Sequence, residues 1–129
     1  MNKEYAALPL RLILGLVFIV HGYAKLFGGI PSTTEFFSSL GIPLAGFFAY
    51  VVSILEFFGG IALVLGFFVS IVSILLAVDM LVATLLVHLP NGFYVGNGGY
   101  EFTLSLLAGL VTLAMLGSGK LSLQKVFKR

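Results

Sequence analysis

The chain contains no cysteine and few charged residues. The lack of cysteine excludes disulfides, thiol redox chemistry, cysteine-ligated zinc and iron–sulfur clusters bound by this polypeptide. Charged residues make up 9% of the 129 residues, hydrophobic residues make up 60%, and the mean hydropathy is +1.16. A soluble domain of this length cannot bury so many apolar side chains, so lipid must solvate much of the surface. The composition therefore predicts an integral membrane protein.

The stretch 8–27 is the first predicted transmembrane helix, long enough for a hydrocarbon core of about 30 Å. At about 100° per residue, its basic side chains fall on one face together with two glycines. This face consists of Arg11, Gly15, Phe18, Gly22 and Lys25, with His21 at its edge. We expect it to contact other helices, because basic groups are unfavourable next to lipid. The stretch has no small-residue cleavage site, so we expect a retained span and not a signal peptide.

Three further apolar stretches follow, at residues 44–67, 69–89 and 101–117. Together with the first, they predict an all-α integral membrane four-helix bundle of antiparallel spans. The length favours a single domain that covers residues 1–129. No internal repeat or low-complexity segment interrupts it.

Two connecting segments also have readable patterns. Residues 32–40 predict a short interfacial helix between the first two spans, capped by Ser32 or Thr33 with Glu35 in its first turn. Residues 90–100 contain two Asn-Gly turns, which predict a compact loop at the outer end of the bundle.

The basic residues predict the orientation in the membrane. All of them except Lys25 lie near the two ends of the chain, at Lys3, Arg11, Lys120, Lys125, Lys128 and Arg129. An even number of spans places both termini on one side, and the positive-inside rule makes that side cytoplasmic. We therefore expect a multi-pass protein of the cell (plasma or inner) membrane. The basic tail suits anionic lipid headgroups, whereas nothing in the sequence indicates nucleic-acid binding.

A rise of about 1.5 Å per residue gives each polar side chain an expected depth in the membrane. Arg11 lies about 5 Å from the cytoplasmic end, where it can snorkel to the headgroups. Near the middle, at about 15 to 20 Å, we expect a central cluster of Glu56, Asp79 and His21. At about 23 to 28 Å, near the outer interface, we expect an outer cluster of Lys25, His88 and Glu101.

Buried carboxylates cost several kcal/mol in a membrane unless they are paired or protonated, so the central cluster needs an explanation. It suits a proton relay, or a polar pocket for the head of an amphiphilic ligand such as a quinone. The same residues also fit a purely structural role that holds helices together. Asp79 and His88 differ by about 180° on an ideal helix, so a rotation or helix break is needed before both can face one groove.

The other candidates have structural interpretations as well. Arg11 and Lys25 fit interface anchors, while His88 and Glu101 each lie where a helix dipole favours their charge. No pair of histidines or acids has a strong metal-ligand spacing, so we predict no metal site, and bis-histidine haem is disfavoured by the different depths of His21 and His88.

Four segments together resemble the DoxX family of small four-helix membrane proteins, in the order of that family. They are RLILGLVFIVHGYAKLFG, ILEFFGGIALVLG, DMLVATLLVHLPNGF and GGYEFTLSLLAGLVTLAMLGSGKLSL. The resemblance covers nearly the whole chain. Carried over residue by residue, it assigns the family's polar positions to Arg11, His21, Lys25, Glu56, Asp79, His88 and Glu101, with Gly98 and Gly99 before the last.

The resemblance implies a membrane subunit of a redox system. The family includes membrane subunits of archaeal systems that pass electrons from sulfur compounds or into quinol oxidases, and bacterial partners of oxidoreductase complexes. We therefore expect an accessory subunit and not an autonomous enzyme, with no covalent cofactor, a quinone as ligand and a protein partner in a redox complex. Distant relatives imply the alternative of a non-catalytic assembly or chaperone subunit. A homo-oligomer and small-molecule transport also stay open.

Overall fold

The computed structural model describes residues 2–128, and within that range all regular secondary structure is helical, with no strand. Four longer helices dominate, namely α1 (Ala7–Leu26), α3 (Ala45–Leu65), α4 (Val69–Ala83) and α5 (Glu101–Leu116). Two shorter helices are α2 (Ile30–Ser39) and α6 (Leu123–Phe127). Short 3-10 turns cover Lys3–Tyr5, Leu89–Asn91 and Val95–Asn97, and the π-helical turn η2 covers Thr84–His88.

Three helical stretches are long and apolar enough to cross a membrane, namely Lys3–Leu26, Ala45–Leu65 and Val69–Asn91. The third combines α4 with the turns that continue it. Helix α5 is apolar but has only 16 residues, which is shorter than the predicted fourth span. The prediction of an all-helical membrane protein is therefore confirmed, while four complete spans stay a prediction.

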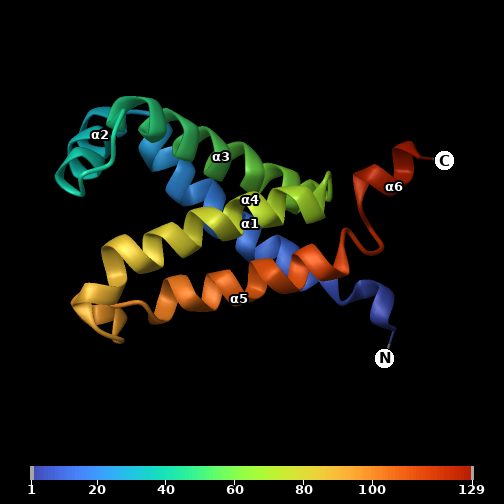
Figure 1. The fold of residues 1–129 in the computed structure, drawn as a ribbon. Coiled ribbons are helices and arrows are strands. Elements are labelled where there is room, and N and C mark those ends of the chain that lie inside the picture. The colour runs from blue at the N-terminus through green and yellow to red at the C-terminus, as the bar shows by residue number, and fades with distance from the viewer. Residues whose placement is uncertain (1, 129) are drawn as a thin grey trace.

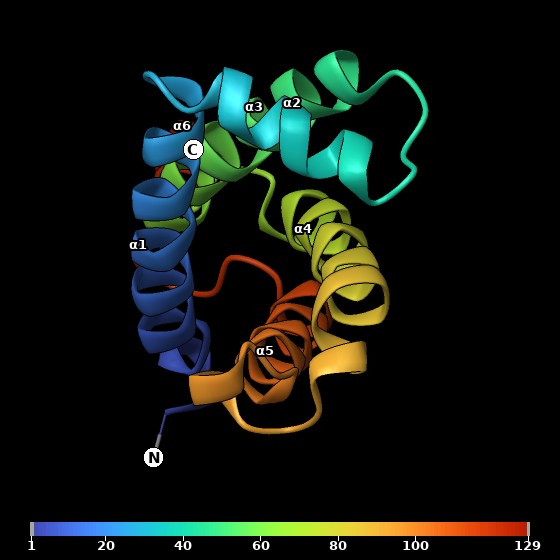
Figure 2. The ribbon, with the colours of Figure 1, turned by 90° about the vertical axis from the view of Figure 1, so that its left-hand side faces the viewer.

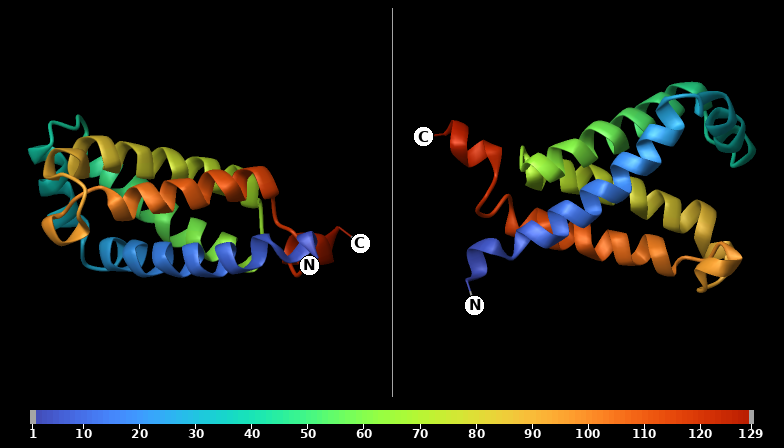
Figure 3. Two further views of the ribbon diagram at one scale, coloured as in Figure 1. Left: turned by 90° about the horizontal axis from the view of Figure 1, so that it is seen from below. Right: turned by 180° about the vertical axis from the view of Figure 1, so that it is seen from behind.

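The longer helices form two pairs. Helix α1 packs most extensively on α3, and α4 packs on α5. The pairs lie close together near the chain termini, which are both at one end of the molecule, and they diverge toward the end that carries α2 (Figure 1). The views from below and behind show the same arrangement, with the loop between α4 and α5 also at the α2 end (Figure 3).

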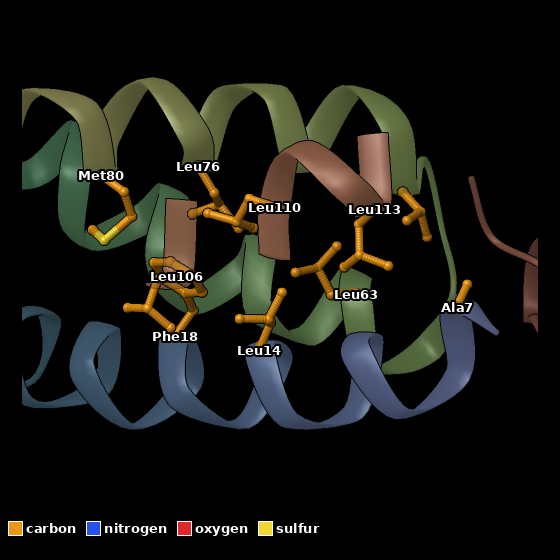
Figure 4. Packing of buried hydrophobic residues seen from close by; sticks show 10 residues of the cluster. Ala7, Leu14, Phe18, Leu63, Leu76, Met80, Leu106, Leu110 and Leu113 are labelled. Carbon is orange, nitrogen blue, oxygen red and sulfur yellow. The ribbon is translucent and has the colours of Figure 1, made fainter. Parts of the chain in front are cut away.

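The hydrophobic core fills the half of the molecule near the termini (Figure 4). Its buried members come from residues 7–18 of α1, the end of α3, residues 69–80 of α4 and residues 106–113 of α5. They include Leu14, Phe18, Leu63, Leu76, Met80, Leu106, Leu110 and Leu113. Because these side chains occupy the convergent end, the divergent end is left with less apolar material between the helix pairs.

Glycines bring the backbones of α1 and α3 into direct contact. A Cβ added to Gly22 would lie 2.3 Å from the backbone nitrogen of Phe57. On the other helix, a Cβ added to Gly60 would lie 2.7 Å from the carbonyl oxygen of Gly15. Small residues allow this approach, which gains packing energy that lipid cannot supply.

Replacing Gly22 with alanine is expected to force α1 and α3 apart and to destabilise the protein by about 1–3 kcal/mol through overpacking. Reversible unfolding in mixed detergent micelles would measure the change. Gly46→Ala is the matched control, because the same methyl group on α3 would have Thr34 Cγ2, at 3.8 Å, as its nearest neighbour. Equal stability of the two variants would contradict the close packing of α1 on α3.

Helix α2 lies in the segment where a short helix was predicted, but its capping was predicted wrongly. It begins at Ile30, with Gly29 at the N-cap position and no side-chain cap. The Ser32 hydroxyl instead donates a hydrogen bond to the Gly29 carbonyl at 3.1 Å. Pro31 explains the earlier start, because proline lacks an N–H and suits the first turn of a helix.

Candidate functional site

A cavity of about 970 Å³ lies between the two helix pairs at their divergent end. The view along the molecule from that end shows α1, α3, α4 and α5 arranged in a ring, with α2 across one side (Figure 2). All five of these helices contribute to the wall. The volume is at the upper end of the range for small-molecule sites, which are mostly apolar with a few polar groups.

Most of the wall is apolar, and its ionisable side chains come from three elements of the bundle. They are His21 and Lys25 on α1, Glu56 on α3, and Asp79 and His88 on α4 and the turn that follows it. Five of the seven predicted site residues thus line one cavity. Arg11 and Glu101 do not.

Lys25 and Glu56 form an ion pair that links α1 to α3. The Lys25 Nζ lies 2.6 Å from Glu56 Oε2, and the side chains are 29% and 3% exposed. The close approach of the helices at Gly22 sets the two residues side by side. The membrane depths counted along the sequence placed Lys25 in the outer cluster and Glu56 in the central one. That separation is wrong, because the long lysine side chain spans the difference in depth between the two backbone positions.

Asp79 approaches this pair from α4. Its carboxyl group lies close enough to Glu56 and Lys25 to interact with both. The Asp79 Oδ2 atom is buried and has no hydrogen-bond partner within residues 2–128. The Lys25 ammonium contacts Glu56 and not Asp79 within hydrogen-bond distance, and a buried acidic oxygen without a partner is costly until a proton or a donor satisfies it.

Both histidines belong to the cavity wall, and each ring is held by a backbone carbonyl. His21 Nδ1 lies 2.8 Å from the carbonyl oxygen of Val17, and its ring centroid is 6.4 Å from that of Phe102 on α5. His88 Nδ1 lies 2.8 Å from the carbonyl oxygen of Gly98. These contacts orient the rings and leave the Nε2 atoms available to a ligand or a proton.

The π-helical turn explains how Asp79 and His88 come to line the same cavity. On an ideal helix they would point in opposite directions, so a rotation was required. The turn Thr84–His88 supplies this rotation, because i→i+5 bonding turns the chain through a smaller angle per residue than the i→i+4 bonding of an α-helix. A hydrogen bond of 2.9 Å from the Thr84 hydroxyl to Thr103 Oγ1 fastens the turn to α5.

Glu101 organises the loop instead of facing the cavity. Its Oε2 accepts a hydrogen bond of 2.9 Å from the backbone N–H of Val95. Gly99 makes the tight crossing in this loop possible, because an added Cβ would lie 2.4 Å from the Gly92 carbonyl oxygen. The compact loop is as predicted, but a place for Glu101 in the ligand site is not supported by this geometry.

Arg11 does not snorkel, which corrects the sequence prediction. The residue is 1% exposed, and its guanidinium donates to the carbonyls of Leu63 and Val64 at the end of α3, at 3.0 and 3.1 Å. It also donates to three carbonyls of the C-terminal segment, those of Ser118, Lys120 and Leu121. The segment folds back over Arg11, so the carbonyl groups that a helix end leaves unpaired replace water around the charge.

Helix α2 is the part of the wall that sequence reasoning missed. Thr33, Phe36, Phe37 and Leu40 line the cavity, and Pro43 follows in the connection to α3. The sequence predicts a short interfacial helix over residues 32–40, and that prediction did not include a contribution to a ligand site. Among the described residues 2–128, no group of three or more histidine, cysteine, aspartate or glutamate side chains could hold a metal ion.

Long apolar helices around a cavity with one charged cluster are the features of a multi-pass helical membrane protein with an internal cavity. The chain belongs to the DoxX family, which matches residues 6–89.

Relatives along nearly the full chain agree with this family. The chain is 39% identical over 131 residues to "Putative oxidoreductase CatD" of Bacillus subtilis, covering 99% of this chain and 93% of that protein. It is 32% identical to "Uncharacterized membrane protein Rv3486" of Mycobacterium tuberculosis, covering 90% and 77%. It is 27% identical to "Inner membrane protein YqjF" of Escherichia coli, covering 98% and 95%. No solved structure matches the chain.

Proposed function

We propose that this protein binds a quinone-type amphiphile in the cavity and serves as the membrane subunit of a redox system. The observation that carries the proposal is a large apolar cavity whose charged cluster ends in the unpartnered Asp79 Oδ2. The name of the Bacillus subtilis relative, which refers to an oxidoreductase, supports the same direction. A bound quinone would supply reversible transfer of electrons and protons; the chain's own residues would bind and orient it.

Each polar residue has a role that its position supports. The Lys25 ammonium donates to a carbonyl oxygen of the head, while Glu56 holds the ammonium in place through the 2.6 Å ion pair. Asp79 Oδ2 accepts a hydrogen bond from a hydroxyl of the head or holds a proton for it. His21 and His88 offer Nε2 atoms in the wall for proton exchange. The apolar side chains around them exclude water, which strengthens these interactions.

The proposal includes a protein partner and a defined orientation. Electrons must come from a partner's cofactor, because the sequence has neither cysteine nor a cofactor motif. Four membrane spans with both termini cytoplasmic would place Arg11 and the basic C-terminal residues at the inner surface of the cell membrane, following the positive-inside rule. The cavity would then lie in the outer half of the bilayer.

A second candidate function is that of an assembly subunit without a ligand. The observation in its favour is that the Lys25–Glu56 ion pair joins α1 to α3 and would contribute to the fold without any ligand. Asp79 distinguishes the two functions, since its Oδ2 has no hydrogen-bond donor among residues 2–128 and its carboxyl group lies beside the like-charged Glu56.

Replacing Asp79 with leucine is expected to weaken quinone binding at least about tenfold, since a hydrogen bond to a charged group contributes about 1.5–3 kcal/mol. Thermal stability should stay unchanged or rise, because the substitution removes an unsatisfied buried polar group. Equilibrium binding of decylubiquinol, the reduced form whose hydroxyl group can donate to Asp79, to protein in lipid nanodiscs would measure the first effect, and unfolding temperature the second.

Ser73→Ala is the matched control for this experiment. Ser73 is also on α4, is fully buried, and has a hydroxyl with no hydrogen-bond partner among residues 2–128, but it does not line the cavity. It should leave quinone binding unchanged. Loss of stability in Asp79→Leu with no change in binding would favour the assembly function instead.

A further inference from the structure

The cavity reaches the outer surface of the protein on one side. Seven large apolar residues line the cavity and are also 38–54% exposed, namely Phe36, Phe48, Leu75, Val78, Val82, Leu86 and Phe102. Six of them come from α2, from the first half of α3, and from α4 with the turn η2 that continues it, whereas Phe102 comes from α5. The cavity therefore opens sideways, between the α2–α3 segment on one side and α4 on the other. We call this opening the lateral opening.

The arrangement of the helices explains the lateral opening. Helices α3 and α4 are joined by a tight connection at Gly66 and separate steadily from that point (Figure 1). At the far end, α2 packs on α3, and α4 packs on α5 (Figure 2). The rim consists of apolar side chains on both sides, which is the surface that lipid tails solvate well and water does not.

The charges inside the cavity limit the chemistry of the ligand's head. Glu56 and Asp79 carry two acidic groups against the single ammonium of Lys25. A phosphate headgroup would meet two carboxyl groups in a surrounding of low polarity, where like charges repel strongly. A neutral head that both accepts from Lys25 and donates to Asp79 Oδ2 meets no such repulsion. The cluster thus disfavours phospholipids and favours a head with carbonyl or hydroxyl groups.

We infer that the ligand enters from the bilayer through the lateral opening, with a neutral carbonyl- or hydroxyl-bearing head at Lys25 and Asp79 and a long apolar tail between α2 and α4. This inference rests on the proposed function and adds to it the ligand class and the direction of entry. A ligand with an apolar tail does not have to leave the membrane to bind, and its tail contacts the exposed apolar side chains of the rim.

The test narrows the lateral opening with a single bulky side chain. Val82→Trp places an indole at the rim, and Leu81→Trp is the matched control. Both residues are on α4 and both are 44% exposed, but only Val82 lines the cavity. Two probes share a hydroquinone head, whose hydroxyl groups can both accept and donate, and a diazirine, with a decyl chain in the first and an ethyl group in the second. Flash photolysis of nanodisc samples at increasing times, followed by intact-protein mass, would give labelling rates.

The tailed probe is expected to label Val82→Trp about tenfold more slowly than the wild type, and to label Leu81→Trp at the wild-type rate. The short probe should label all three proteins equally, since its head site is intact. A wild-type rate for the tailed probe in Val82→Trp would overturn lateral entry. Equal slowing of both probes would also overturn it, because tryptophan would then be occupying the head site. Absence of labelling in the wild type would refute the proposed function, and lateral entry with it.

Discussion

Arg11→Met is expected to lower the free energy of unfolding by at least about 4 kcal/mol, because it removes a buried charge that satisfies five backbone carbonyls. Each carbonyl left buried without a donor costs about 1–3 kcal/mol. The C-terminal segment, which reaches α1 and α3 through this guanidinium, should also detach. Unfolding in mixed micelles would measure the loss of stability, and limited proteolysis of the segment that follows Gly117 would measure its detachment.

Arg11→Lys should fail to restore the wild-type stability. A guanidinium presents five donors in a planar fork, whereas an ammonium group is a compact point charge with three. Lysine could therefore reach the carbonyls of Leu63 and Val64 or those of the C-terminal segment, but not both sets. Lys125→Met, which removes an exposed basic residue of the same segment, is the control and should behave like the wild type. A stable Arg11→Lys variant with a protected C-terminus would contradict the role assigned to Arg11.

The second large effect is expected for Lys25→Met. The substitution leaves Glu56, which is 2% exposed, next to Asp79 without a counter-charge. Removal of one partner of a buried ion pair typically costs about 3–5 kcal/mol. Adding Glu56→Gln to Lys25→Met should recover most of this loss, because no unpaired charge then stays buried. Unfolding measurements on the two single variants and the double variant form a complete thermodynamic cycle.

The chain offers a matched control for this cycle. Lys120 and Glu4 form an ion pair with the same distance of 2.6 Å, but their side chains are 44% and 55% exposed. Lys120→Met should leave the stability nearly unchanged, since exposed ion pairs contribute little. The recovered double variant would be stable but unable to bind a quinone, which separates the fold from the proposed function. A Lys25→Met variant as stable as Lys120→Met would show that the Glu56 carboxylate is not buried next to Asp79 as the structure indicates.

Much of the candidate site was visible in the sequence because apolar helices make polar residues conspicuous. His21, Lys25, Glu56, Asp79 and His88 were selected on that basis, and all five line one cavity. Arg11 and Glu101 were selected by the same rule and lie elsewhere. A polar side chain within an apolar helix needs a partner, but the sequence does not show whether that partner is a ligand, another side chain or a backbone carbonyl.

Contacts between helices were the part that the sequence did not reveal. Depth counted along each helix separated Lys25 from Glu56, because such a count ignores side-chain length and the close approach at Gly22. The angle between Asp79 and His88 indicated a conflict, but only the π-helical turn showed how the chain resolves it. Helical periodicity fixes directions within one helix and contains no information about how a neighbouring helix is placed.

The sequence by itself determined that lipid solvates much of the protein surface and that the fold is helical. It also identified the few polar residues whose place in apolar helices needs an explanation. Those properties follow from the free energy of transferring each side chain between water and lipid, which depends on composition and local order. The tertiary structure alone decided that the helix pairs diverge, that α2 covers a cavity and that this cavity opens sideways. These features depend on where side chains fill space and where they do not, and packing is a property of several distant segments at once.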